Sequence, residues 1–174
     1  MMKLDITKGI QRKGSDVPFE LEDTWGEDRW NGDTIVFAEP VSVSGTYMLA
    51  DETVILRGTA RARITSPCAR CLKGTDTVLE AEVEEAFVRD IGEETIVDED
   101  QYTYSGHVLE LDEAVRTALL LEMPSRILCR EDCRGLCVRC GQDLNINACS
   151  CQKDLPRKNP FSALASLLNE DEEV

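Results

Sequence analysis

Hydrophobic and polar residues alternate along much of the first half of the chain, and this period of two residues predicts β-strands. Val41 to Leu49 form one alternating run, a second run continues after a turn as far as Ile64, and a third covers residues 75–88. Because the three runs follow one another without a helical pattern between them, they predict an antiparallel meander and not βαβ units. Shorter strands are predicted at residues 3–7, 17–22 and 102–104.

The second half of the chain predicts two helices. Asp112 is a suitable N-cap for a helix whose apolar residues keep helical spacing as far as Met123, and Pro124 ends that helix. Asn159 and Pro160 begin a second helix, with proline at its first position. The expected fold is therefore α+β: mainly an antiparallel β-meander or partly open barrel, with a few helices.

The length and composition of the chain suit one domain with a modest core. It has 174 residues, of which 42% are hydrophobic, so a single core with a small metal-bound appendage is expected. No apolar run is long enough to span a membrane, and residues 1–6 contain no signal-peptide core. These features predict a cytoplasmic protein whose thiols stay reduced.

The charge of the chain is distributed unevenly. The net charge is −15, yet residues 57–73 carry five bases and no acid, and residues 126–158 carry seven bases and four acids. The rest of the chain therefore carries −23, and the cysteine-containing segments form a basic minority in an acidic protein. Such bases favour contact with phosphate, although exposed bases near turns also occur as a purely solvated surface.

The spacing of the eight cysteines is that of metal ligands. Cys137 and Cys140, followed by Gly141, form a metal-binding knuckle whose natural complement is Cys149 and Cys151. Cys68 and Cys71 lie at a predicted strand turn, where a Cys-x-x-Cys is also typical of a rubredoxin-like knuckle. The cysteines left for a second tetrahedral site are thus Cys68, Cys71, Cys129 and Cys133.

Another partition of the cysteines stays open from the sequence. Cys133 is close enough along the chain to join Cys137 and Cys140, which would leave one site incomplete. One or two structural zinc ions are therefore predicted. An iron–sulfur cluster also takes four cysteines, but the paired knuckles favour zinc.

No catalytic constellation accompanies these cysteines. The sequence lacks a Gly-x-Ser-x-Gly elbow, a Walker loop and a dinucleotide fingerprint. Its only histidine, His107, is predicted to be structural, so an open catalytic zinc site is not expected. The chain is predicted to be no enzyme and to have no small-molecule substrate.

The cysteine motifs resemble those of the YceD family, the large ribosomal RNA subunit accumulation proteins. Residues 67–72, Pro-Cys-Ala-Arg-Cys-Leu, look like the Cys-x-Arg-Cys motif of that family. Residues 133–145, which begin Cys-Arg-Gly-Leu-Cys-Val-Arg-Cys-Gly, are similar to its cysteine-rich branch, and residues 158–167 look like its closing helix. The resemblance implies a non-enzymatic bacterial or plastid protein needed for the accumulation or processing of 23S ribosomal RNA.

The resemblance and the charge pattern together lead to a hypothesis about organisation. Residues 1–125 are expected to form the β-rich domain with one closing helix. Residues 126–174 are expected to form a zinc-ribbon-like segment and a C-terminal helix, packed on the Cys-x-x-Cys turn of the first domain. Zinc would then gather a basic face that contacts precursor 23S rRNA or a nascent large subunit. The arginines assigned to this face are Arg61, Arg63, Arg70, Arg134 and Arg139.

Two other functions fit the same residues. The first is an acidic, zinc-stabilised adaptor that binds a basic ribosomal protein or an rRNA-processing nuclease. The second is a thiol redox sensor that uses Cys68 and Cys71, which predicts low thiol pKa values and reversible disulfide formation. The rRNA maturation step served and the oligomeric state are open at this point.

Overall fold

The computed structural model describes residues 1–92 and 101–151. It divides into two compact units, Met1–Gly135 and Leu136–Val174. The division falls later than the predicted boundary after residue 125, because the segment that carries Cys129 and Cys133 belongs to the first unit. The helix predicted from Pro160 lies outside the described residues.

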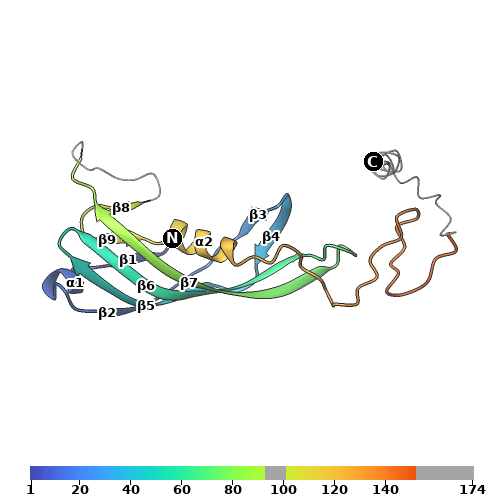
Figure 1. Ribbon diagram of the computed structural model, residues 1–174, viewed down its shortest axis with the longest axis horizontal. Coiled ribbons are helices and arrows are strands. Elements are labelled where there is room, and N and C mark those ends of the chain that lie inside the picture. Colours follow the sequence, from blue (N-terminus) through green and yellow to red (C-terminus); the bar gives the residue numbers. More distant parts are fainter. Residues whose placement is uncertain (93–100, 152–174) are drawn as a thin grey trace, which may run out of the picture. The chain divides into compact units, whose positions relative to one another are not determined.

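The first unit is built on a seven-stranded sheet (Figure 1). Its central strand β6 pairs with β7 along one edge, while β5 and then β4 follow one another along the other edge. The outer strands are β2, which pairs with β5, β3, which pairs with β4, and β8, which pairs with β7 in parallel. The strand bounds are Val17–Asp23 (β2), Glu27–Trp30 (β3), Asp33–Phe37 (β4), Val41–Ala50 (β5), Thr53–Pro67 (β6), Gly74–Arg89 (β7) and Tyr102–Tyr104 (β8).

The antiparallel meander predicted by the alternation is confirmed in β5, β6 and β7. The sheet that they form is open and does not close into a barrel. Along β6, the buried residues Leu56, Ala62 and Ile64 alternate with exposed arginines, as a strand with one face on the core requires. No helix among the described residues is long and apolar enough to cross a membrane.

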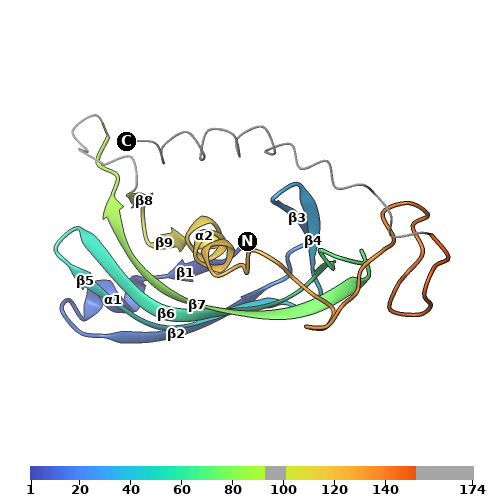
Figure 2. The ribbon, with the colours of Figure 1, turned by 45° about the vertical axis from the view of Figure 1, so that its right-hand side comes forward.

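Helix α2 (Asp112–Leu121) covers one face of this sheet and packs on β6 and β7 (Figure 2). Its buried residues Val115 and Leu119 join the apolar side chains of the sheet in one core. A small second sheet pairs β1 (Lys3–Asp5) with β9 (Val108–Glu110), and a short helix α1 (Thr7–Gln11) follows β1. Burial of apolar side chains between the sheet and α2 stabilises the unit.

The predicted N-cap role of Asp112 is wrong. Leu111 is the N-cap residue, and no side chain caps the helix. The Asp112 carboxylate instead accepts a hydrogen bond from the backbone amide of Met2 at 2.9 Å. A negative charge in the first turn still interacts favourably with the helix dipole, and here it also fastens the N-terminal segment.

Two glycines face each other where β5 and β6 pair. Gly45 and Gly58 are register partners, and a Cβ atom on Gly45 would lie 2.1 Å from the carbonyl oxygen of Arg57. Real Cβ atoms do not approach backbone atoms so closely, so the two strands need glycine at this point.

We expect Gly45→Ala to lower the free energy of unfolding by about 2 kcal/mol, because the methyl group forces the two backbones apart. Chemical denaturation monitored by circular dichroism measures the change. Ser44→Ala is the matched control, since Ser44 directly precedes Gly45 in β5 and its side chain is exposed. Equal stability of the two variants would contradict the close approach.

Candidate metal centres

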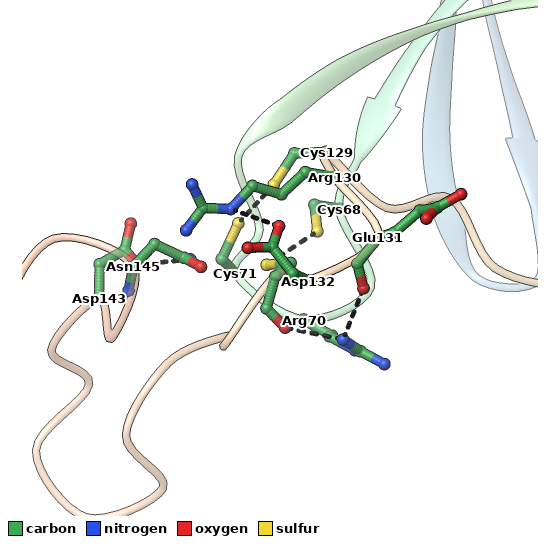
Figure 3. A network of polar contacts seen from close by, with 10 residues as sticks. Cys68, Arg70, Cys71, Cys129, Arg130, Glu131, Asp132, Asp143 and Asn145 are labelled. Carbon is green, nitrogen blue, oxygen red and sulfur yellow. Dashed lines mark hydrogen bonds and ion pairs between the residues drawn. The ribbon is translucent and has the colours of Figure 1, made fainter.

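Four cysteines of the first unit converge and are called here the first tetrad: Cys68, Cys71, Cys129 and Cys133. Cys68 and Cys71 lie in the turn between β6 and β7, and the other two follow α2. The Sγ atoms of Cys68 and Cys133 are 3.9 Å apart, those of Cys71 and Cys129 are 3.6 Å apart, and all four lie within 4.8 Å of one another (Figure 3). Four sulfurs at about 2.3 Å from one zinc ion lie about 3.8 Å from each other, so the geometry suits a single tetrahedral ion.

Backbone and arginine contacts hold the two segments of the first tetrad together. The amide of Ala69 donates to the carbonyl of Ile127 at 2.9 Å. The Arg70 guanidinium donates from Nη1 to the carbonyl oxygens of Cys133 at 2.7 Å and Glu131 at 3.3 Å (Figure 3). Arg70 therefore fixes the loop that presents Cys133, while the residue itself stays exposed.

Gly135 completes this arrangement. Its φ of +72° is in the left-handed region, and a Cβ atom there would lie 2.8 Å from the carbonyl oxygen of Arg70. Glycine alone combines this backbone conformation with such a close approach.

The second tetrad comprises Cys137, Cys140, Cys149 and Cys151, whose sulfur atoms also lie within 4.8 Å of one another. Leu136 and Asp143 form an antiparallel bridge around the first pair of cysteines. The Asp143 carboxylate accepts hydrogen bonds from the backbone amide of Asn145 at 2.8 Å and from its side chain at 2.7 Å. This turn is the connection that the sequence places between the two pairs.

The two Cys-x-x-Cys turns have the same backbone hydrogen bonds. Cys68 donates to Lys73 and accepts from Leu72 at 2.8 and 2.9 Å, while Cys137 donates to Gln142 and accepts from Gly141, both at 2.8 Å. The residue after the second cysteine has a positive φ in each turn, +62° for Leu72 and +72° for Gly141. The two turns thus share one backbone conformation, which is typical of knuckles that present cysteines to a metal, although leucine in this conformation is strained.

The thiols of each tetrad differ in acidity. Burial disfavours the Cys68 thiolate, but backbone hydrogen bonds, those from Cys129 and Arg70 foremost, outweigh burial and lower the pKa of Cys68 to about 6. Backbone hydrogen bonds from Cys140 and Arg139 likewise lower the pKa of Cys137 to about 6. Amide groups directed at the first sulfur of a knuckle stabilise a thiolate, which is the form that binds metal.

The last-ionising thiols show why a cation suits these sites. Burial, followed by the neighbouring sulfur atoms, raises the pKa of Cys129 to about 12. The hydrogen bond with Cys140, followed by burial, raises the pKa of Cys151 to about 12. Four thiolates this close repel one another, and a divalent cation between them removes that repulsion.

The donor set favours a structural ion. Four thiolates at tetrahedral separations suit zinc or a single iron, and they leave no open position for a substrate or water. An iron–sulfur cluster distributes its cysteines over several irons, whereas the sulfurs here are close enough to share one ion. All eight cysteines are free thiols, and the two tetrads are the sets that the knuckle pairing favoured.

The predicted arginines lie in varied surroundings. Arg61 forms an ion pair with Glu80 of β7, and Arg63 with Glu39, each at 3.0 Å. Arg134 and Arg139 are exposed and belong to different compact units. The local sequence does not predict that β7 glutamates pair with the β6 arginines, because this pairing depends on the register of the hairpin.

Comparison with known proteins gives one family match. The model of the family described as "Large ribosomal RNA subunit accumulation protein YceD" matches residues 56–168, a range that contains all eight cysteines. No solved structure matches the chain.

Curated relatives are similar at 27% identity. An uncharacterised protein of Mycobacterium leprae matches over 114 residues, 63% of this chain and 52% of that protein. One from Mycobacterium bovis matches over 148 residues, 82% and 70% of the two chains. A chloroplast homologue of the large ribosomal RNA subunit accumulation protein in Arabidopsis thaliana matches over 143 residues, 66% of this chain and 44% of that protein. The chain thus spans about half the length of the Mycobacterium leprae and Arabidopsis relatives.

We expect Arg70→Ala to weaken metal binding at the first tetrad about tenfold, because the loop that carries Cys133 loses the group that positions it. Competition with a chromophoric chelator measures the affinity, and the second tetrad should release its metal unchanged. Arg126→Ala is the control, since Arg126 is exposed and has no hydrogen bond or ion pair within residues 1–92 and 101–151. Equal affinities in the two variants would show that Arg70 does not support the site.

Proposed function

Because this chain belongs to the YceD family, we propose that it is a non-enzymatic ribosome-biogenesis factor that supports the accumulation of 23S rRNA in the cytoplasm. The observation that carries the proposal is the extent of the family match, which includes most of β6, all of β7 and α2, and both tetrads. The matched range contains the turn between β6 and β7 and all eight cysteines, and these are the parts of the chain to which the proposal assigns the function.

In this proposal each tetrad binds one structural zinc ion. A closed site with four thiolates contributes its binding free energy to folding, because the unfolded chain does not hold the ligands together. The support is that the four sulfurs of each tetrad lie within 4.8 Å of one another and that all eight cysteines are free. Zinc at the first tetrad would keep the segment after α2 on the turn between β6 and β7.

Contact with precursor 23S rRNA is the first mode of action. Arg61, Arg63, Arg70, Arg134 and Arg139 are its proposed contacts. The ion pairs of Arg61 and Arg63 are exposed, and exposed pairs contribute at most about 1 kcal/mol. Phosphate groups of RNA can therefore replace the carboxylates at small cost, with release of counterions.

An adaptor role is the second mode, and the same ion pairs favour it. Carboxylates neutralise the β6 arginines in the free protein, and the chain as a whole carries −15. An acidic surface of this kind attracts a basic ribosomal protein or a nuclease with a basic face. Both contacts are compatible with work on one nascent large subunit.

Replacing Arg134 and Arg139 together by alanine tests the RNA mode. We expect the slope of log affinity against log salt for precursor 23S rRNA to fall by about 1.5, because two phosphate contacts are lost. Mature large-subunit rRNA should also decrease relative to small-subunit rRNA in cells that contain only the variant. Filter binding and quantitative RNA analysis give the two readouts.

The control replaces the exposed Arg12 and Lys13, which removes the same charge elsewhere. If the chain bound no rRNA but bound basic ribosomal proteins without RNA, the adaptor mode would hold. If cells without the chain kept normal 23S rRNA, the proposed function itself would be wrong.

A further inference from the structure

Strand β7 has a long free edge. One edge pairs with β6 from Gly74 to Arg89, whereas the other pairs with β8 only at Phe87–Arg89. In the group of long strands, β7 and β2 form the two borders (Figure 1). Along residues 76–84, no described part of the chain pairs with the outer edge of β7.

The hydrogen-bond pattern identifies the groups on this edge. In an antiparallel pair, residues alternate between bonding to the partner strand and directing their amide and carbonyl groups away from it. Cys68 donates to Lys73 and Arg89 donates to Glu52, so the odd-numbered residues of β7 bond to β6. The even-numbered ones direct their backbone groups outward, as the bond from Asp90 to Tyr104 confirms at the end of the strand. The outward set is Asp76, Val78, Glu80, Glu82 and Glu84.

Four of these five residues are acidic, and residues 74–86 contain no Lys or Arg. Glu80 and Glu84 each bind a β6 arginine through Oε1, which leaves the second carboxylate oxygen for another donor. Glu82 has no hydrogen bond or ion pair with the described residues. The opposite face of the strand is apolar, with Leu79 and Val83 buried.

The chemistry of this edge selects among occupants. A second β7 strand would place its own glutamates beside these, and like charges on neighbouring strands destabilise the pair. The phosphate groups of RNA would be repelled by the same carboxylates. A basic strand would place Lys or Arg beside Glu80, Glu82 and Glu84, and apolar residues beside Leu79 and Val83. The other border strand, β2, is short and contains Pro18, which makes it a poorer template.

We propose that the β7 edge binds an extended basic segment of a partner protein as an additional strand. Backbone hydrogen bonds to the even-numbered residues supply affinity, and alternating basic and apolar side chains supply specificity. The inference rests on the adaptor mode of the proposed function, since proteins that bind rRNA carry basic segments. It assigns that mode to a defined surface.

The test uses a fluorescent peptide of alternating Lys and Val that is long enough to span residues 76–84. Fluorescence anisotropy measures binding to the full chain, and hydrogen exchange followed by NMR identifies the amides involved. We expect slower exchange at Val78, Glu80, Glu82 and Glu84 when the peptide is bound. An alternating Glu and Val peptide, and a Lys and Val peptide N-methylated at every second residue, should bind at least about tenfold more weakly.

Two variants locate the site on the protein. The triple change E80Q/E82Q/E84Q should weaken binding about tenfold and flatten its salt dependence. Glu82→Pro removes an outward amide without breaking a bond to β6, and should also abolish slow exchange along the edge. The control E20Q/E22Q removes two exposed charges from β2 and should leave binding unchanged.

Several outcomes would overturn the proposal. These are equal binding of the N-methylated peptide, slowed exchange elsewhere with the β7 amides unchanged, and edge amides that already exchange slowly in the free protein. The last would show that this chain or a second copy holds the edge. None of these outcomes bears on whether cells need the chain for 23S rRNA, so failure here is distinguishable from failure of the proposed function.

Discussion

The convergence of four sulfur atoms at the first tetrad is the constraint on which the organisation of the first unit depends. Cys68 and Cys133 are separated by 65 residues along the chain, yet their sulfurs lie 3.9 Å apart. Closing such a long loop reduces the conformational entropy of the chain, and this loss opposes folding. The apolar contacts of α2 with β6 and β7 offset part of this loss, and an ion bound by thiolates from both segments would offset more. The hydrogen bonds of Arg70 and Ala69 are too few to offset this entropy loss by themselves.

One hairpin carries several roles at once. The inward residues of β6 and β7 form the core with α2, and their outward residues form a ladder of arginine and glutamate. The turn between the strands presents Cys68 and Cys71, and the outer edge of β7 is free of strand partners over residues 76–84 among the described residues. Because the hairpin register fixes all of these positions, a slip of one residue would invert the core and the charged face together. The site and the proposed docking surface therefore depend on the same ladder.

The sequence predicted the parts of the structure that local patterns determine. The period of two identified β5, β6 and β7, and the Cys-x-x-Cys spacing with Gly141 identified the second knuckle. The Cys-x-x-Cys spacing at a strand turn also predicted the first knuckle, whereas the positive φ of Leu72, a position where glycine would be expected, is seen only in the structure. Strand β3, Glu27–Trp30, has a polar sequence and forms only by pairing with β4, and the ion pairs of the β6 arginines depend on a register that no local motif reports. The knuckle spacing favoured the observed cysteine partition, but the fold was needed to exclude the alternative in which Cys133, which is nearer in sequence to the second tetrad than to Cys68, joins Cys137 and Cys140.

Elemental analysis of the purified chain, with no metal added, tests the central claim most directly. The account predicts two zinc ions per chain. It predicts one per chain when Cys68 and Cys71 are replaced by serine, with the remaining ion held by the second tetrad, and unfolding of the variant at lower denaturant concentration. Absence of metal together with disulfide-bonded cysteines, or loss of both ions when only the first tetrad is changed, would contradict two independent structural zinc sites.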